Sequence, residues 1–224
     1  MDTKKLLHRY PLLLVLVAFI VASVAVSCGS NPEIDRQLTK AEEIMEQHPD
    51  SAYMLLNSID KETLSTRKEK ARYALLMSQA LDKNYIDTTT FDVLQPAIDY
   101  YINKDKGSPD EKLKTLYYQG IIFLNRSELD MSMQCFLKAN DLNNNYTDTL
   151  IYAHLLVAQG YLYNQSCLID DYIQHNIVAS TLYHKLGKED FRQSSLLRAL
   201  DGCIVTNNKH KADSIMTITD SLAE

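Results

Sequence analysis

The sequence predicts an all-α fold, a solenoid of antiparallel helix hairpins preceded by a signal peptide. The 224 residues include only six Gly and five Pro, and none of the Pro lies beyond Pro109, so helix breakers are scarce. Apolar residues recur three and four positions apart through most of the chain, as on the buried face of a helix. The same pattern returns about every 40 residues, a period typical of helical repeat proteins.

The first 27 residues have the pattern of a secretory signal peptide. Lys4, Lys5 and Arg9 precede an apolar stretch over 12–26, and small residues follow it. The stretch is short for a membrane span, which needs about 20 apolar residues. We therefore divide the chain into a signal peptide over 1–27, a tether over 28–32 and a helical repeat domain over 33–224.

The cysteines divide into one at the end of the leader and three in the repeats. Cys28 follows small residues and resembles the bacterial lipobox, with Ala25 where Leu is commonest. The resemblance implies cleavage before Cys28 and acylation, which would anchor the protein to an envelope membrane. The alternative is an ordinary signal peptide with an incidental Cys. Cys135, Cys167 and Cys203 match no metal-binding spacing and are predicted as small core residues, although export also permits one disulfide.

Periodicity and capping residues place the individual helices. Asp50 or Ser51 is expected to cap the second helix, and Pro109 suits the first turn of a later one. Pro96 is expected close to the start of its helix, where a missing amide hydrogen is tolerated. The other predicted helices cover 33–47, 65–83, 89–103, 112–125, 149–164 and 191–207, and each of the last three is followed by a second helix.

Small residues mark the repeats at Ser78, Gly120, Gly160 and Gly202, with spacings of 42, 40 and 42 residues. Small residues at the middle of a helix let a neighbouring helix approach closely. The repetition therefore predicts closely packed hairpins.

The clearest unit, which starts at Leu113, resembles the tetratricopeptide repeat. Its small and aromatic residues stand at the offsets of that family: Gly120, Phe123, Ser132, Phe136 and Ala139. Leu116 stands in place of the usual Trp and Asn144 in place of the usual Pro.

The two later units fit the repeat less well. Around Gly160, Tyr172 falls where a small residue belongs, and an insertion near 164–171 would restore the match at Ala179 and Tyr183. The final unit fits through its second helix, at Ala212 and Met216.

A wider resemblance covers most of the mature chain. The runs 49–52 (PDSA), 71–76 (ARYALL) and 82–87 (DKNYID) resemble the opening of the tetratricopeptide lipoproteins common in Bacteroides-type bacteria. Members often continue into more repeats, and some into a membrane helix and a cytoplasmic segment. This chain would then be a short or truncated member.

The resemblance implies a concave groove lined by the first helix of each unit. The family's groove positions fall on Arg72, Leu75, Gln79, Lys114, Tyr117, Ile121, Asn125, His154, Val157, Tyr161 and Gln165. This amphipathic mixture suits an extended peptide or a partner helix. Tyr117 is the expected anchor for a partner, unless its ring packs between hairpins as Phe123 does.

No enzymatic motif stands out, since the chain lacks a Gly-rich phosphate loop, HExxH and GxSxG. No cofactor or metal site is expected. The net charge of −6 and the lack of a basic stripe argue against nucleic acid. The predicted function is a membrane-anchored scaffold for protein–protein interaction at the bacterial envelope. The alternatives are a glycan-binding outer-membrane lipoprotein, although the chain has no Trp for sugar stacking, and the sensory part of a signalling protein.

The anchor prediction is tested by processing. We expect mature protein to begin at acylated Cys28 and to partition into detergent, because buried acyl chains contribute about 0.8 kcal/mol per methylene. Cys28→Ala should be released or remain unprocessed, whereas Cys167→Ala should behave as wild type. Wild-type protein that is soluble and cut at another site would refute the anchor.

Overall fold

The computed structural model describes residues 31–142 and 147–220, and this part of the chain is helical and contains no β-strand. The all-α prediction is thus confirmed for the described part. The predicted signal peptide, Cys28 and residues 28–30 of the tether lie outside the described residues, as does Asn144. None of the described helices is both long and apolar enough to span a bilayer.

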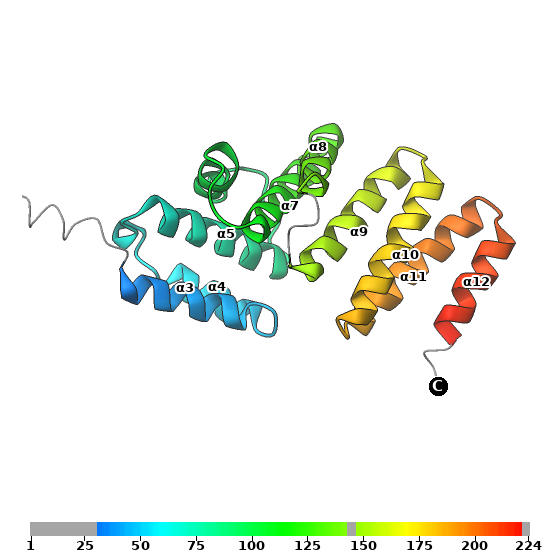
Figure 1. Ribbon diagram of the computed structural model, residues 1–224, viewed down its shortest axis with the longest axis horizontal. Coiled ribbons are helices and arrows are strands. Elements are labelled where there is room, and N and C mark those ends of the chain that lie inside the picture. The colour runs from blue at the N-terminus through cyan, green and yellow to red at the C-terminus, as the bar shows by residue number, and fades with distance from the viewer. Residues whose placement is uncertain (1–30, 143–146, 221–224) are drawn as a thin grey trace, which may run out of the picture.

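The helices pack as adjacent antiparallel pairs that follow one another along the molecule, the arrangement expected of an α-solenoid (Figure 1). Their bounds are α3 Pro32–Ile44, α4 Pro49–Asn57, η1 Lys61–Thr63, α5 Arg67–Lys83, α6 Gln95–Ala97, η2 Ile98–Asn103, α7 Pro109–Asn125, α8 Leu129–Asn140, α9 Thr149–Gln165, α10 Ile169–Lys185, α11 Glu189–Val205 and α12 Lys209–Asp220.

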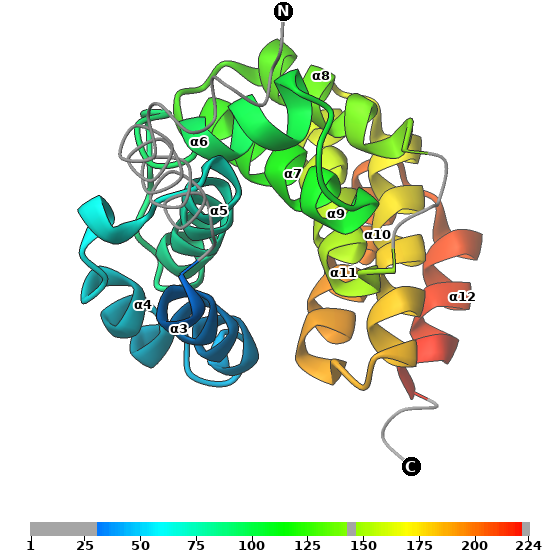
Figure 2. The same cartoon turned by 60° about the vertical axis from the view of Figure 1, so that its left-hand side comes forward.

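The pairs form an arch. In Figure 2, α3, α5, α7, α9 and α11 lie on its inner side, and α4, α8, α10 and α12 lie on its outer side. The arm that contains α3 therefore faces the arm that contains α11 across the opening. This curvature gives the molecule a concave surface to which every inner helix contributes one strip.

Capping residues explain where several helices begin. Ser108 caps α7 by accepting a hydrogen bond from the Glu111 amide, and Pro109 occupies the first turn as predicted. The predicted cap of α4 is wrong. That helix begins earlier, at Pro49, after His48, because a Pro in the first turn needs no amide partner.

The predicted helix over 89–103 is shorter and partly of another type. Its regular part begins at Gln95, so Pro96 lies in the first turn, where its missing amide hydrogen costs nothing. From Ile98 to Asn103 the chain continues as a π-helix. The residues before Gln95 instead form turns.

The turns after α7, α9, α10 and α11 each contain a residue with left-handed backbone, as the turn after α5 does at Tyr85 with a φ of 57°. Ser127, Cys167, Gly187 and Asn207 have φ values of 60°, 59°, 65° and 51°. After each, an amide bonds back to the last helical turn, for example from Glu128 to the Phe123 carbonyl at 2.9 Å. This is a Schellman termination, which closes a helix within three residues.

These turns correct two register predictions. No insertion separates α9 from α10, because the same three-residue turn joins them as joins α7 to α8. Tyr172 therefore occupies the position of Ser132. Gly202 is also not the counterpart of Gly120. Seven residues separate Gly120 from Ser127, whereas Gly202 lies five before Asn207 and contacts Ile173 of the preceding helix α10.

Gly120 marks the closest approach of α7 and α8. A carbon atom added at Gly120 would overlap the fully buried ring of Phe136, with its Cδ1 and Cζ atoms at 2.7 Å and 2.9 Å. Ser132 strengthens the same contact by donating a hydrogen bond to the Gly120 carbonyl at 2.9 Å. The small residues of this unit thus serve the close packing that the repeat pattern predicts.

This contact predicts opposite behaviour for two glycines. We expect Gly120→Ala to destabilise the protein by about 1–3 kcal/mol, because overpacking against Phe136 outweighs the better helix propensity of Ala. Gly160→Ala should change the stability by no more than about 1 kcal/mol, because its nearest neighbour is a single side-chain atom, Asn176 Nδ2 at 3.0 Å, and no ring overlaps the added carbon. Urea unfolding measures both, and equal effects would contradict the packing.

Candidate binding groove

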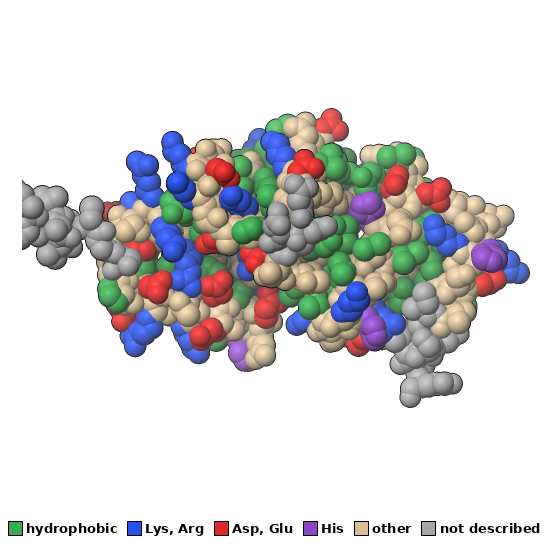
Figure 3. Space-filling view, viewed as in Figure 1, with side chains coloured by type: hydrophobic (Ala, Val, Ile, Leu, Met, Phe, Trp, Pro, Cys, Tyr) green, Lys and Arg blue, Asp and Glu red, His purple; other side chains and the backbone are tan. Residues whose placement is uncertain are grey.

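The concave surface contains two hollows that divide it into halves. We call the first the charged half. It has a volume of about 500 Å³ and is lined by residues of α3, α5, α7 and the segment that enters α9. We call the second the aromatic half. It measures about 220 Å³ and is lined by residues of α7, α9, α10 and α11. Figure 3 shows denser charged side chains over α3 to α5 and more apolar ones over α9 to α11.

Arg72 organises the charged half by joining α5 to α3. Its guanidinium nitrogens lie 2.8 Å from carboxylate oxygens of Asp35 and Glu42, and 3.0 Å from the Thr39 hydroxyl. Only 22% of the Arg72 side chain is exposed, against 67% for Asp35 and 48% for Glu42. The cation is therefore covered while its two partners face solvent.

Two further ion pairs follow the same pattern along the groove. Lys83 Nζ lies 3.0 Å from Glu46, and Lys114 Nζ lies 3.0 Å from Asp148. In both pairs the lysine is less exposed than its carboxylate. Lysine stems lie along apolar surface and keep the charge at its rim, so the paired carboxylates dominate what a ligand meets.

Asp110 adds a firmly ionised carboxylate. Burial works to raise its pKa, but hydrogen bonds from Thr147 and from the Asp148 amide outweigh it, so the pKa lies below the usual value. The two Asp110 oxygens accept these bonds at 2.6 to 2.9 Å. The segment before α9 is thereby attached to the start of α7.

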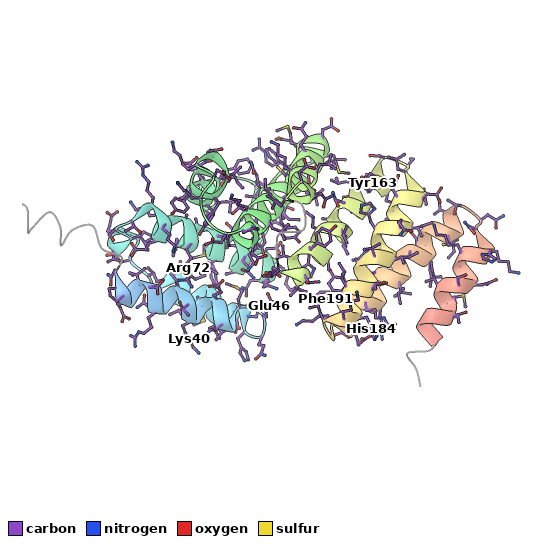
Figure 4. The ribbon with its side chains drawn as sticks, viewed as in Figure 1. Lys40, Glu46, Arg72, Tyr163, His184 and Phe191 are labelled. Carbon is purple, nitrogen blue, oxygen red and sulfur yellow. The ribbon has the colours of Figure 1, made fainter. Side chains whose placement is uncertain are left out.

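The aromatic half is built around His154. The Tyr183 hydroxyl lies 2.7 Å from His154 Nδ1, and the Phe191 ring packs edge-on against the imidazole at 5.1 Å. Burial, followed by the nearby charge of Lys83, lowers the pKa of His154 from 6.5 to about 4. His154 is therefore neutral at neutral pH. Figure 4 shows Glu46 and Phe191 on opposite sides of the opening between the two arms.

Most of the predicted groove residues line the two hollows, but few of them remain available to a ligand. Arg72, Leu75, Gln79 and Lys114 line the charged half, and Tyr117, His154, Val157 and Tyr161 line the aromatic half. Gln79 is buried and donates weakly to Glu46 at 3.4 Å. Tyr161 is exposed, as is Gln165 at the end of α9.

Ile121 and Asn125 lie away from both hollows. They line a separate crevice between α5 and α7, and Asn125 donates a hydrogen bond to the Thr88 carbonyl at 3.1 Å. Tyr117 is only 8% exposed and packs between Tyr118 and Phe136, with ring centroids at 5.0 Å and 6.2 Å. Its ring therefore closes the floor of the aromatic half as a core residue.

The groove continues into α11, a helix in which the sequence predicted no groove residue. Leu197, Ile204 and Val205 are 64%, 74% and 65% exposed there. Leu197 and Val205 lie 40 residues after Val157 and Gln165, so the repeat period would have located them. Gly202 obscured this, because taking it as the repeat marker shifts the register by two residues.

Arg198 is the cation of the aromatic half. It lines the hollow together with Tyr161 and Tyr172, and no hydrogen bond or ion pair engages it within the described residues. Its positive charge lies at the opposite end of the groove from the exposed carboxylates of α3.

The cysteine prediction is confirmed at two positions and wrong at one. Cys135 and Cys203 are buried, and Cys167 is exposed in the turn between α9 and α10. All three are free thiols. Within the described ranges no group of His, Cys, Asp or Glu could hold a metal ion.

No protein-family model, no curated protein and no solved structure matches this chain.

The low pKa of His154 predicts a loss of stability in mild acid. The unfolded chain binds a proton near pH 6.5, whereas the folded protein resists protonation down to about pH 4. The contribution of His154 is complete above pH 6.5 and declines as the pH falls towards 4. His154→Gln should flatten this part of the profile in urea unfolding, and His210→Gln on the exposed surface should not. Identical profiles for all three proteins would refute the assignment.

Proposed function

We propose that this protein is a tetratricopeptide-type solenoid, anchored at a bacterial envelope membrane, that binds a segment of another protein in its concave groove. The observation that carries the proposal is the row of exposed apolar side chains on the inner helices α9 and α11. Tyr161, Leu197 and Val205 are all exposed there, although large apolar residues are normally covered. Apolar side chains gathered on a concave surface are typical of interaction sites.

The repeat type is supported by the packing of α7 on α8. Gly120, Ser132 and Phe136 meet at the helix contact, at the offsets of the tetratricopeptide pattern. The anchor is supported by the leader and Cys28 in the sequence. We propose binding rather than catalysis, because the basic side chains of the charged half are held in ion pairs and the aromatic half is lined mainly by aromatic and apolar side chains.

A glycan ligand is the second candidate, and one observation favours it. Tyr161 presents an exposed ring beside Asn164 and Arg198, and sugars stack on such rings next to hydrogen-bonding groups. The flanking Leu197 and Val205 offer no partners for hydroxyl groups, which favours a polypeptide.

Site-specific photo-crosslinking in whole cells tests the proposal. A photoreactive amino acid at Tyr161 or Leu197 should give a discrete adduct with a second protein, because both side chains stand in the groove. Leu137 on α8 is the matched control for Tyr161, since both are 46% exposed, and Met54 on α4 is the control for Leu197. Equal adducts from outer and inner positions, or adducts with polysaccharide alone, would contradict protein binding in the groove.

A further inference from the structure

We infer that the groove takes a polypeptide segment with basic residues at one end and bulky apolar residues at the other, the basic end lying against α3 and α5 and the apolar end against α9 and α11. This inference rests on the proposed function and adds the chemistry and direction of the partner.

The charged half has a negative surface. Its hollow is lined by four acidic side chains, Glu42, Asp110, Glu111 and Asp148, and by two basic ones, Arg72 and Lys114. The lining therefore has an excess of two negative charges, and Glu42 is the most exposed member of the pairs it contains, at 48% against 22% for Arg72. A hollow whose lining has an excess of one sign of charge attracts a ligand of the opposite sign.

The ion pairs leave the carboxylates able to accept more. A carboxylate has two oxygens and about four acceptor sites. Arg72 binds one oxygen each of Asp35 and Glu42, and both acids remain about half or more exposed. Lysine or arginine side chains of a partner could therefore add hydrogen bonds without breaking those that hold α5 to α3.

The aromatic half favours apolar residues of a partner, where the charged half favours basic ones. Phe191, Leu197 and Val205 are exposed on α11, and Tyr161 is exposed on α9, where it lines the hollow together with Arg198 of α11. Arg198 is the only charged side chain among the residues that line this hollow, so a basic residue of a partner meets no carboxylate in its lining. Apolar groups at one end and opposite charges at the two ends together define a single direction for the partner.

Three labelled peptides test this chemistry on the full-length protein in mild detergent. One carries a lysine run, a Gly-Ser spacer and the segment Leu-Phe-Ile-Leu, and the second replaces lysine with glutamate. The third keeps lysine and replaces the apolar segment with serine. By fluorescence anisotropy, corrected for detergent alone, we expect the first peptide to bind about tenfold or more tighter than either of the others. Its binding should weaken in about 0.5 M salt, which screens exposed charges.

Two pairs of variants assign the affinity to the groove. Glu42→Gln should weaken the lysine peptide several-fold, whereas Glu43→Gln, on a similarly exposed acid of α3 outside the hollow, should leave it unchanged. Leu197→Ser should weaken it about tenfold, and Met54→Ser on α4 should not. Circular dichroism confirms that each variant is folded, and the control substitutions separate local binding from general surface effects.

The direction is tested with a benzophenone at either end of the first peptide. The apolar end should crosslink to α9 or α11 and the lysine end to α3 or α5. Equal affinity for the lysine and glutamate peptides, or crosslinks in the reverse order, would overturn the inference. If the peptide tests fail but a cellular protein still crosslinks through Tyr161 and Leu197, the proposed function stands and only the inferred chemistry of the partner is wrong. If those crosslinks are also absent, both fall.

Discussion

The groove depends on one backbone constraint, the left-handed residue in the turns between helices. At Ser127, Cys167, Gly187 and Asn207 the chain reverses within three residues, and the following amide bonds back to the helix. Helices α9, α10 and α11, which two of these turns join, therefore pack side by side as antiparallel neighbours. A non-glycine residue in this conformation is strained by about 1 kcal/mol or more. The hydrogen bonds that close the helix and the packing of the hairpin offset this cost.

A second principle is the double use of polar residues on the inner helices. Residues that the sequence predicted to face a ligand hold neighbouring elements together, as Arg72 does for α3 and Asn125 does for the segment before α6. A side chain whose donor groups are engaged in this way has few hydrogen bonds left to donate to a ligand. The surface that remains open is shifted towards α9 and α11, where apolar residues have no such partners. The charged half thus serves both stability and recognition, whereas the exposed apolar residues of the aromatic half are left to recognition.

Sequence reasoning located the helices well but the groove only in part. Pro109 and the residues around Gly120 carry local signals, because a missing amide hydrogen and a missing side chain restrict where they can stand. The left-handed backbone at Ser127 and Cys167 carries none, since Gly or Asn is the residue expected there. Taking Gly202 as the repeat marker also shifted the register of α11 by two residues. Leu197 and Val205 were therefore missed.

The sequence by itself determined the all-helical class, the period near 40 residues and the residues that allow close helix contact. These follow from local spacing and from the size of single side chains. Only the tertiary structure decided which groove residues are free. Arg72 meets Asp35 and Glu42 across 37 and 30 residues of chain, and Tyr117 is covered by rings from its own and neighbouring helices. Such pairing depends on how the curved stack brings helices together, and helical periodicity along the chain contains no information about that curvature.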